Sequence, residues 1–444
     1  MDTFVVGPGA REHAILHECL KSESVGTAYY GPGGNGGMSL IAEQARGSID
    51  DFDSLVSFAK ANLGKGSLTI VGPEVPLAKG IVDRFEREGL LILGPRLNAA
   101  RVEYDKYFLK VLAVSSLIPT AKYTAFMSAS DAKSHIQANY FRKGKGRCVV
   151  KANDLMAGKG VIVPKSIPAA FAAVDYLLAK SKDRLILVEE FLKGWECSFT
   201  VLTDGTTVLP LETATDYKRL SDGDEGPNTG GMGGFSPIPG LAPSKNRRFA
   251  PSLFDRMLEI MERIIQVLKN RGIIYKGFLY GGFMVTQDGN PMLLECNCRL
   301  GDPEAQIIIP PNFLELCYGA ALGELKGMSI KKRDEALVNV VIASPGYPDN
   351  PQTGLMIYNL EKASKEGATI FHAATGRDAG GNFHTSGGRV LSVVGRSCVE
   401  GGNIEKALRT AKEMAYRAAG HISFGSPDPS QGKQCYRRDI AKID

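Results

Sequence analysis

Two oxygen-bearing side chains lie one residue apart in the segment LLECNCRLGDPE (293–304). The preceding DGNPM is typical of a hairpin turn, so the segment is predicted to be a strand whose side chains alternate between two faces. Glu295, Asn297 and Arg299 then share one face. Carboxylate and amide oxygens at this spacing suit Mg²⁺, which retains several waters and shares phosphate oxygens. A solvated polar face is the alternative interpretation of the same pattern.

The opposite face of this strand is predicted to be apolar. It carries Leu294, Cys296, Cys298 and Leu300, and free cysteine is among the residue types most often buried. The chain has eight cysteines, no C-x-x-C and no second cysteine pair at zinc spacing. A thiolate metal site and a disulfide framework are therefore both disfavoured, and we expect reduced thiols in a cytoplasmic protein.

Two further segments could bind a phosphate and a purine. In VVKANDLMAGKGVIV (149–163), two apolar strands flank a loop rich in Gly and Lys, and Lys151 could hold a phosphate as a point charge. The loop is not a Walker motif, because no Ser or Thr follows its Gly-Lys-Gly and a strand comes next. In LILVEEFLKGWECSF (185–199), a strand ends at two glutamates that could accept from amines and ribose hydroxyls. A surface hairpin and an ordinary strand end are the respective alternatives.

The first hundred residues predict a sheet that could position such groups. Four short apolar runs each end in Gly-Pro, and helical patterns separate them. Strands alternating with helices predict an open parallel α/β sheet, in which ligands bind beyond the carboxyl ends of the strands. GPGGNGG (31–37) favours a phosphate cradle of backbone N–H groups, although turn punctuation would explain any single Gly-Pro pair. GPGARE lacks the third glycine of a dinucleotide fingerprint, which argues against a nicotinamide cofactor.

The rest of the chain predicts further α/β and α+β units, so the fold class is a multidomain one. The 444 residues exceed what one core usually supports. The loop DGDEGPNTGGMGGFSP (222–237) is expected to be neither helix nor ladder strand, and an ordered loop of this length is usually functional. The predicted domains are an N-terminal open parallel α/β substrate-binding domain (1–100), a linking helix (101–120), a small lid subdomain (121–190), a large subdomain with the metal strand (191–330) and a small C-terminal α+β domain (331–444).

Composition narrows the class of function. The 53 basic and 48 acidic residues are interspersed, and the net charge of +5 is too small to indicate nucleic-acid or membrane binding. No apolar run approaches the roughly 18 residues of a membrane span. The N-terminus also lacks the basic start and long apolar centre of a signal peptide. A cytoplasmic enzyme acting on small, anionic molecules is the expectation.

Seven motifs occur in the order found in one known family. They are VGPGAREHA, VGPEVPLAKGIVD, KANDLMAGKGV, EEFLKGWECSF, DYKRLSDGDEGPNTGGMG, ECNCRLGDPE and TSGGRVL. The sequence thereby resembles the phosphoribosylamine–glycine ligases, or glycinamide ribonucleotide synthetases, from residue 3 to about 440. The resemblance implies central ATP-grasp domains, ATP with Mg²⁺ or Mn²⁺, and a cytoplasmic monomer or weak dimer. It implies ligation of glycine to 5-phosphoribosylamine through glycyl phosphate, giving glycinamide ribonucleotide, ADP and phosphate in purine biosynthesis.

The resemblance also implies roles for individual residues. The expected catalytic residues are Arg299, Asp216 and Lys218. The expected ATP-binding residues are Lys106, Lys151, Gly158, Lys159, Gly160, Glu189, Glu190, Phe191, Leu192 and Glu196. The expected substrate-binding residues are Gly9, Asn35, Glu74, Thr229, Gly230, Gly231 and Asp302. The expected metal ligands are Glu295 and Asn297.

The sequence departs from the family pattern at Pro8, Asp154, Thr215 and Ala441. Pro8 and Thr215 lie near expected substrate positions and motivate a second interpretation, an ATP-grasp paralog that joins a different amino acid or amine. A third interpretation is a non-catalytic ATP-binding regulator, which the retention of Lys151, Glu295, Asn297 and Arg299 disfavours. Asp154 adds a carboxylate to the expected lid, and we expect Lys159 in the same loop to compensate its charge.

Overall fold

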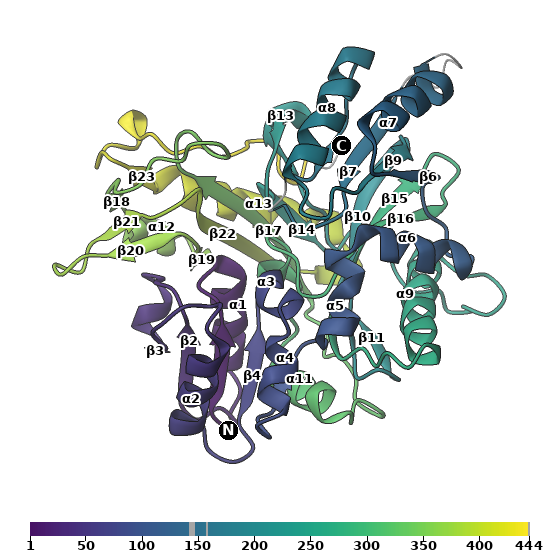
Figure 1. Ribbon diagram of the computed structural model, residues 1–444. Helices are drawn as coiled ribbons and strands as arrows, with labels where there is room; N and C mark the ends of the chain where they lie inside the picture. The colour runs from purple at the N-terminus through teal and green to yellow at the C-terminus, as the bar shows by residue number, and fades with distance from the viewer. Residues whose placement is uncertain (142–146, 157–158, 443–444) are drawn as a thin grey trace.

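The computed structural model describes residues 1–141, 147–156 and 159–442. Within these ranges the chain forms one five-stranded and three four-stranded sheets, together with smaller two-stranded ribbons. In Figure 1 the N-terminal sheet (strands within residues 3–93) lies at the bottom, and the C-terminal sheet (strands within 233–398) lies on the left. The sheet called the lid sheet (within 123–190) lies at the top, and the sheet called the large sheet (within 194–297) lies on the right. Within the same ranges no helix has the length and hydropathy needed to cross a membrane.

The N-terminal sheet is parallel, as the alternation of strands and helices predicts. Its strand order is β3-β2-β1-β4-β5. The strands are β1 (Thr3–Val6), β2 (Ala28–Gly31), β3 (Glu43–Gln44), β4 (Leu68–Val71) and β5 (Ile92–Leu93). The intervening helices are α1 (Ala10–Cys19), α2 (Phe52–Asn62), α3 (Glu74–Ala78) and α4 (Ile81–Glu86). The four predicted strands are confirmed, and the short exposed β3 was not predicted.

A pair of helices connects this sheet to the rest of the molecule. The sequence predicts one helix over 101–120, whereas the structure has α5 (Leu97–Tyr104) and α6 (Lys106–Ser115). Asp105 separates them because its backbone is extended and its carboxylate accepts from Phe108 N–H at 2.9 Å, which caps α6.

The lid sheet is antiparallel, in the order β6-β9-β7-β8. Its strands are β6 (Tyr123–Phe126), β7 (Cys148–Ala152), β8 (Val161–Ile162) and β9 (Ile186–Glu190). Helices α7 (Ala129–Ile136) and α8 (Ile167–Lys180) accompany it, and a π-helical turn (Gln137–Phe141) follows α7. These elements share a hydrophobic cluster of their own, which is separate from the two larger clusters of the described chain.

The large sheet has the order β11-β10-β15-β16. Its strands are β10 (Gly194–Thr203), β11 (Val208–Pro210), β15 (Gly277–Thr286) and β16 (Pro291–Asn297). The amphipathic α9 (Leu253–Asn270) packs on this sheet through Phe254, whose ring lies 4.9 Å from that of Phe199. Two short helices, α10 (Ala305–Ile308) and α11 (Phe313–Leu322), lead out of the sheet.

The C-terminal sheet takes one strand from the glycine-rich loop. Its order is β14-β17-β22-β19, with β14 (Gly233–Ser236), β17 (Glu335–Ala343), β22 (Arg389–Cys398) and β19 (Thr369–His372). Helix α13 (Ile404–His421) packs against β17 and β22, and α12 (Leu360–Ser364) lies beside α13. The small ribbons pair β18 (Ile357–Tyr358) with β23 (Ser423–Phe424) and β20 (Thr375–Arg377) with β21 (Phe383–Thr385).

The prediction that 222–237 contains no ladder strand is therefore wrong. Besides β14, the loop contains β13 (Glu225–Asn228), which pairs with β12 (Arg219–Ser221). Glycine allows the close approach that β14 needs, because a Cβ at Gly234 would lie 2.2 Å from the Thr215 carbonyl oxygen. The partner of β14 is β17, about a hundred residues later in the chain.

Residues 437–441 return to this ribbon. The Arg437 side chain is 1% exposed and binds Asp224 at 2.8 Å and Asp439 at 2.7 Å. Its guanidinium also lies 4.8 Å from the centre of the Tyr217 ring. Tyr217 in turn accepts a hydrogen bond from Ala441 N–H at 3.1 Å. The segment thus fixes the two strands that lead into the glycine-rich loop.

Candidate active site

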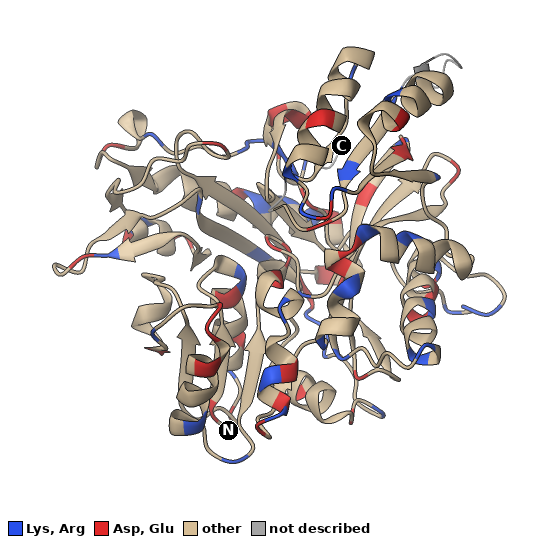
Figure 2. Ribbon diagram, viewed as in Figure 1, with Lys and Arg blue, Asp and Glu red and all other residues tan. Residues whose placement is uncertain are grey.

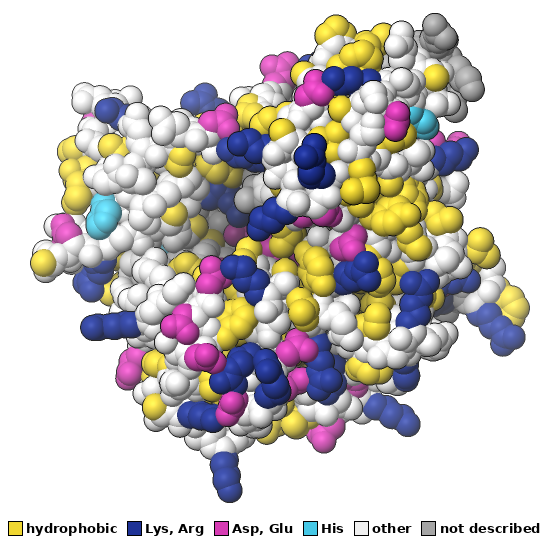
Figure 3. Space-filling view, in the orientation of Figure 1, with side chains coloured by type: hydrophobic (Ala, Val, Ile, Leu, Met, Phe, Trp, Pro, Cys, Tyr) yellow, Lys and Arg dark blue, Asp and Glu magenta, His cyan; other side chains and the backbone are white. Residues whose placement is uncertain are grey.

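Charged side chains meet where the four sheets converge. Figure 2 shows Lys, Arg, Asp and Glu segments gathered at the centre of the molecule. The space-filling view shows a recess between the C-terminal sheet and the lid sheet, with Lys and Arg side chains along it (Figure 3).

Strand β16 presents its polar face as predicted. Cys296 and Cys298 are each 2% exposed, whereas Glu295, Asn297 and Arg299 are half-buried. The burial of both cysteines is thereby confirmed, and their interpretation as small buried side chains holds.

The register of β16 differs from the prediction at one residue. Gly282 pairs with Glu295 and Phe283 pairs with Leu293, so Leu294 forms a bulge. As a result Leu293 is buried, and Leu294 is not on the buried face where simple alternation places it. The bulge has a structural partner, because the Leu294 carbonyl accepts from Lys151 Nζ at 3.2 Å.

Glu295 and Asn297 form a donor set that fits Mg²⁺ or Mn²⁺. Neither side chain accepts a hydrogen bond from the described residues. Burial opposes ionisation of Glu295, but the nearby cations, Lys218 first, outweigh it and hold its pKa below the ordinary value. The described residues contain no group of three or more His, Cys, Asp or Glu side chains placed to hold a metal. Two oxygen ligands suit an ion that completes its shell with phosphate oxygens and water.

The predicted ATP-binding lysines border this strand. Lys151 Nζ lies 3.1 Å from Glu189 Oε2. Lys106 begins α6 and donates to the Asp154 carbonyl at 2.9 Å. Burial lowers the pKa of Lys106, although Glu295 opposes this effect. The two lysines therefore flank the space in front of the carboxylate.

Lys110 is a functional candidate that the sequence analysis missed. It is 3% exposed, and its Nζ lies 3.0 Å from the same Glu189 oxygen that binds Lys151. Burial lowers its pKa to about 8, although Glu189 favours its charged form. The spacing KYFLK could have revealed it, because residues four apart lie on one helix face. The other oxygen, Glu189 Oε1, is buried and accepts no hydrogen bond.

The remaining residues that are expected to bind the nucleotide differ in the contacts they make. Glu190 accepts from Lys122 N–H at 2.8 Å and thus secures the edge of the lid sheet. The Phe191 ring lies 5.5 Å from the Arg147 guanidinium, and Leu192 is half-buried. Glu196 pairs with Lys218 at 3.1 Å, and Lys218 also lies 3.8 Å from Glu295.

Asp216 is an acid of the site whose surroundings raise its pKa. Its Oδ1 is buried without a hydrogen-bond partner, and burial followed by the charge of Glu304 raises its pKa well above the ordinary value. A Cβ at Gly231 would lie 2.7 Å from this oxygen, and Gly231 has φ +106. The glycine-rich loop therefore approaches Asp216 more closely than a side chain would allow.

Arg389 joins the C-terminal sheet to the same cluster, and the sequence analysis did not single it out. It pairs with Asp302 Oδ2 at 2.9 Å and donates to the carbonyl oxygens of Gly230, Gly231 and Asp302. Thr229 donates to the Lys218 carbonyl at 2.9 Å, which closes the loop on its other side. The GGRVL motif was quoted for its resemblance, but no residue in it was assigned a role.

Arg299 connects the large sheet to the N-terminal turns. It lies 3.0 Å from Glu74 and 3.4 Å from Glu103, a buried acid that the sequence analysis missed. Burial opposes ionisation of Glu74, but Arg299 and Arg11 lower its pKa to about 2. Glu103 also accepts from Cys298 N–H at 2.7 Å.

Asn35 and Gly9 have structural hydrogen bonds of their own. The Asn35 amide donates to the carbonyls of Pro8 and His372 and accepts from two backbone N–H groups in its own loop. Gly9 N–H donates to Glu12 at 2.7 Å. The Asn35 side chain therefore shapes the loop through these hydrogen bonds.

The expected compensation of Asp154 by Lys159 is wrong. Asp154 Oδ2 accepts from Lys182 N–H at 3.0 Å, in the turn before β9. Lys159 lies 3.2 Å from Asp349 of the C-terminal unit, and both side chains are exposed. Gly160 closes the β7–β8 hairpin by accepting from Ala152 N–H at 2.8 Å. Gly158 lies outside the described residues.

Comparison with known proteins identifies the family. The N-domain, ATP-grasp A-domain and C-domain models of phosphoribosylglycinamide synthetase match residues 1–103, 104–305 and 337–443. The chain is 39% identical to a phosphoribosylamine–glycine ligase of Ralstonia nicotianae, covering 99% of this chain and 98% of that one. The chain belongs to the phosphoribosylglycinamide synthetase family.

Solved structures agree with this family assignment. A phosphoribosylamine–glycine ligase from Thermotoga maritima has a TM-score of 0.80 at 27% identity, covering 99% of this chain and all of that one. The biotin carboxylase domain of a Hydrogenobacter thermophilus 2-oxoglutarate carboxylase has a TM-score of 0.65 at 14% identity, which shows a shared fold alone. The residues expected to bind the metal and the nucleotide lie within residues 104–305, the range that the ATP-grasp domain model matches.

The departures from the synthetase pattern have local structural roles. Thr215 Oγ1 accepts from Phe235 N–H at 3.2 Å, beside β14. Pro8 supplies one carbonyl to the Asn35 amide. Ala441, where glycine is frequent in the family, has φ +53, in the left-handed region that favours glycine. None of these three residues is among those expected to bind the metal or the nucleotide.

Proposed function

We propose that the protein joins glycine to 5-phosphoribosylamine, with conversion of ATP to ADP and phosphate, through a glycyl phosphate intermediate. The supporting observation is the convergence of the Glu295–Asn297 donor pair, Lys106, Lys151 and the Asp216–Arg389 cluster on one recess. The family to which the chain belongs supports the same reaction.

The nucleotide half of the mechanism rests on the lysines and the hinge. Lys106 and Lys151 hold the phosphates, and Glu189 Oε1, which is buried without a donor, accepts from an amine of the base. Glu196 accepts from a ribose hydroxyl once it releases Lys218. Mg²⁺ or Mn²⁺ held by Glu295 and Asn297 would neutralise charge on the transferred phosphoryl group.

The acyl half uses the residues around the glycine-rich loop. A carboxylate is a poor acyl donor, so phosphorylation of glycine precedes attack by the sugar amine. Lys218 and Arg299 orient the anionic reactants, and Asp216 accepts from the glycine ammonium. The N–H groups of the loop 229–231 surround the acyl phosphate, and Arg389 holds that loop by its carbonyls. The lid excludes water, which would hydrolyse the intermediate.

The phosphoribosylamine phosphate binds in the turns at Gly9 and Asn35, at the carboxyl ends of the parallel strands. Glu74 contributes to the binding of this substrate by holding the Arg299 side chain in position. We further propose that the domains are residues 1–100, 101–120, 121–190, 191–330 and 331–444. The proposal also includes a cytoplasmic location and a monomer or weak dimer acting on small molecules.

The test is ADP release with phosphoribosylamine generated in place from ribose 5-phosphate and ammonia. ADP should form only when glycine, the amine and ATP are all present, and mass spectrometry should detect glycinamide ribonucleotide. Faster turnover with another amino acid or amine would instead support a paralog of different specificity. The absence of turnover with intact ATP binding would support a regulator.

A further inference from the structure

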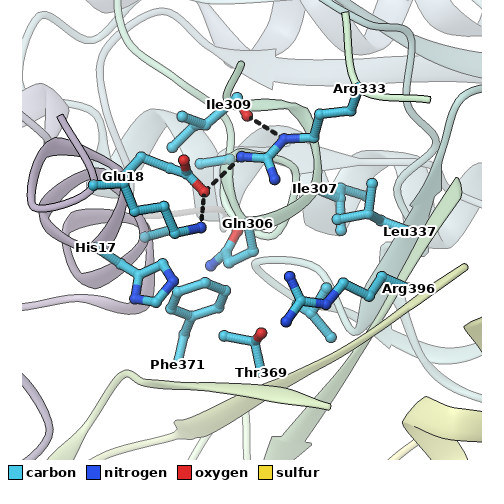
Figure 4. A pocket seen from close by; sticks show the side chains of 14 residues that line it. His17, Glu18, Gln306, Ile307, Ile309, Arg333, Leu337, Thr369, Phe371 and Arg396 are labelled. Carbon is cyan, nitrogen blue, oxygen red and sulfur yellow. Dashed lines mark hydrogen bonds and ion pairs between the residues drawn. The ribbon is translucent and has the colours of Figure 1, made fainter. Parts of the chain in front are cut away.

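A second cavity lies between α1, α10 and the C-terminal sheet, and none of the active-site residues described above lines it. It has about 410 Å³ of empty space, part of it open to solvent. Figure 4 shows the side chains that surround it, which come from α1, α10, the segment before β17 and strands β17, β19 and β22. The cavity thus belongs to the junction of the N-terminal and C-terminal sheets.

The cavity has more cationic than anionic side chains. Of the described residues that line it, Lys21, Arg333 and Arg396 are cations and Glu18 is the one carboxylate. Glu18 Oε1 binds both Lys21 at 2.7 Å and Arg333 at 2.5 Å. Glu335, just outside the lining, lies 3.9 Å from Arg333. An excess of positive charge remains at Arg396.

Arg396 is the cation without a counter-charge. Its side chain is exposed, makes no hydrogen bond or ion pair with the described residues, and lies close enough to His17 to lower the pKa of that imidazole. Arginine presents several N–H donors in a fixed plane, a geometry that matches phosphate and carboxylate oxygens. In Figure 4 its guanidinium lies across the cavity from the Glu18–Arg333 pair. The chemistry of this side of the cavity favours an anion.

Among the side chains that line the cavity, two buried oxygens have no hydrogen-bond donor, Glu18 Oε2 and Gln306 Oε1. Gln306 is 5% exposed, and its Nε2 donates to Asp302 Oδ1 at 2.9 Å. That bond fixes the orientation of the amide and leaves Oε1 buried without a hydrogen bond. Figure 4 shows this amide between the Glu18–Arg333 pair and Arg396. A buried acceptor of this kind is satisfied by a ligand that carries a proton.

We propose that this cavity is a binding site for inorganic phosphate. The phosphate oxygens pair with Arg396 and Lys21, and the P–OH group that inorganic phosphate retains near neutral pH donates to Gln306. Sulfate has the same shape but no proton, and a fully ionised phosphate monoester has none either. Phosphate is a product of the proposed reaction, but binding at this cavity does not depend on turnover. Through Asp302, the same glutamine contacts the Asp302–Arg389 pair of the active site.

His17 provides a reporter inside the cavity. Burial lowers its pKa, and Lys21, Arg396 and Arg333 lower it further, against the opposing charge of Glu18. An anion among these cations changes the environment of the imidazole. We would label the histidines with ¹³C, assign the His17 signal by its loss in His17→Gln, and titrate the intact protein at pH 8. The ligands are phosphate, sulfate and ribose 5-phosphate at constant ionic strength.

Phosphate should shift the His17 signal saturably, and sulfate and ribose 5-phosphate should each bind about tenfold or more weakly, as expected for an unmet hydrogen bond. Arg396→Ala should weaken phosphate binding about tenfold or more, because a charge-assisted contact is lost. Arg409→Ala is the matched control, since Arg409 is exposed on α13 and does not line the cavity. Lys21→Gln should weaken binding in the same direction and provides an independent variant.

Three outcomes would overturn the proposal. If the shift of the His17 signal does not saturate as phosphate is added, the cavity is not a phosphate-binding site. Unchanged phosphate affinity in both Arg396→Ala and Lys21→Gln would place the anion elsewhere. Equal affinity for sulfate and phosphate would exclude recognition of the P–OH group. None of these measurements uses ligase activity, so failure here is distinct from failure of the proposed reaction.

Discussion

Lys110 Nζ lies 3.0 Å from Glu189 Oε2, and both side chains are almost completely buried. Burial disfavours the charged lysine, and its pKa falls to about 8 from an ordinary 10.5. The unfolded chain therefore binds more protons than the folded chain between these two values. Over that window the free energy of unfolding should rise with pH, because the penalty of the buried charge is relieved as Lys110 loses its proton.

Replacing Lys110 by Met should remove that contribution. The change keeps the length of the side chain, and Lys151 still neutralises Glu189. Urea unfolding of parent and variant at several pH values from 8 to 10.5 measures the difference. The parent should gain stability relative to Lys110→Met as pH rises. Parallel pH profiles would show that Lys110 has an ordinary pKa in the folded protein.

Glu295→Gln should reduce turnover about 100-fold or more, since loss of a charged ligand weakens neutralisation of the phosphoryl group. Mn²⁺ binding followed by electron paramagnetic resonance should weaken in parallel. Cys296→Ala should keep turnover within a few fold and lower the free energy of unfolding by about 1–2 kcal/mol, as expected for a small buried cavity. The opposite pattern, with a benign Glu295→Gln, would show that the metal does not bind to the face of β16 that carries Glu295.

Asp154 and Lys159 should behave as independent residues. Asp154→Gly removes an acceptor from Lys182 N–H and should destabilise the lid unit by about 0.5–1.5 kcal/mol. ATP affinities for the parent, Asp154→Gly, Lys159→Ala and the double variant form a cycle. The two changes should add within about 0.5 kcal/mol. A coupling above that value would mean that the two side chains meet when ATP is bound.

Asp216→Asn should abolish ligase activity and yet stabilise the fold. Burial and Glu304 raise the pKa of Asp216, so the folded chain holds this proton more tightly than the unfolded chain. The free energy of unfolding of the parent therefore falls as pH rises above 3.8, the ordinary pKa of an aspartate. An amide at this position is neutral at every pH, so the variant does not show this decrease. At pH 7 the variant should have a higher Tm than the parent, by calorimetry. A lower Tm would show that the carboxylate has a stabilising partner.

Alternation along a strand was sufficient to predict the faces of β16, including the burial of both cysteines. It could not predict the bulge at Leu294, because the register depends on Gly282 and Phe283 of the partner strand. The hydrogen bond from Lys151 to the Leu294 carbonyl could not be predicted for the same reason.

Long-range pairing limited the prediction elsewhere. The glycine-rich segment lacks the composition of a strand, and β14 forms because β17 supplies the partner. Arg389 reaches Asp302 from 87 residues away, so nothing near it in the sequence marks it as a site residue. Lys110 is different, since its helical spacing from Lys106 was available in the sequence. The recognised motifs identified the family, but the part that each residue plays in the site became clear only from its contacts in the structure.

The contact of Arg437 with the β12–β13 ribbon has a consequence for biosynthesis. Arg437 donates to the Arg219 carbonyl, and the two residues are 218 positions apart. A ribosome therefore finishes the large and lid sheets long before it makes the residues that fix the entrance to the glycine-rich loop. A nascent chain can fold those two sheets while the β12–β13 ribbon is still not anchored. The glycine-rich loop would then be fixed at its entrance only after residues 437–441 have been made and have docked.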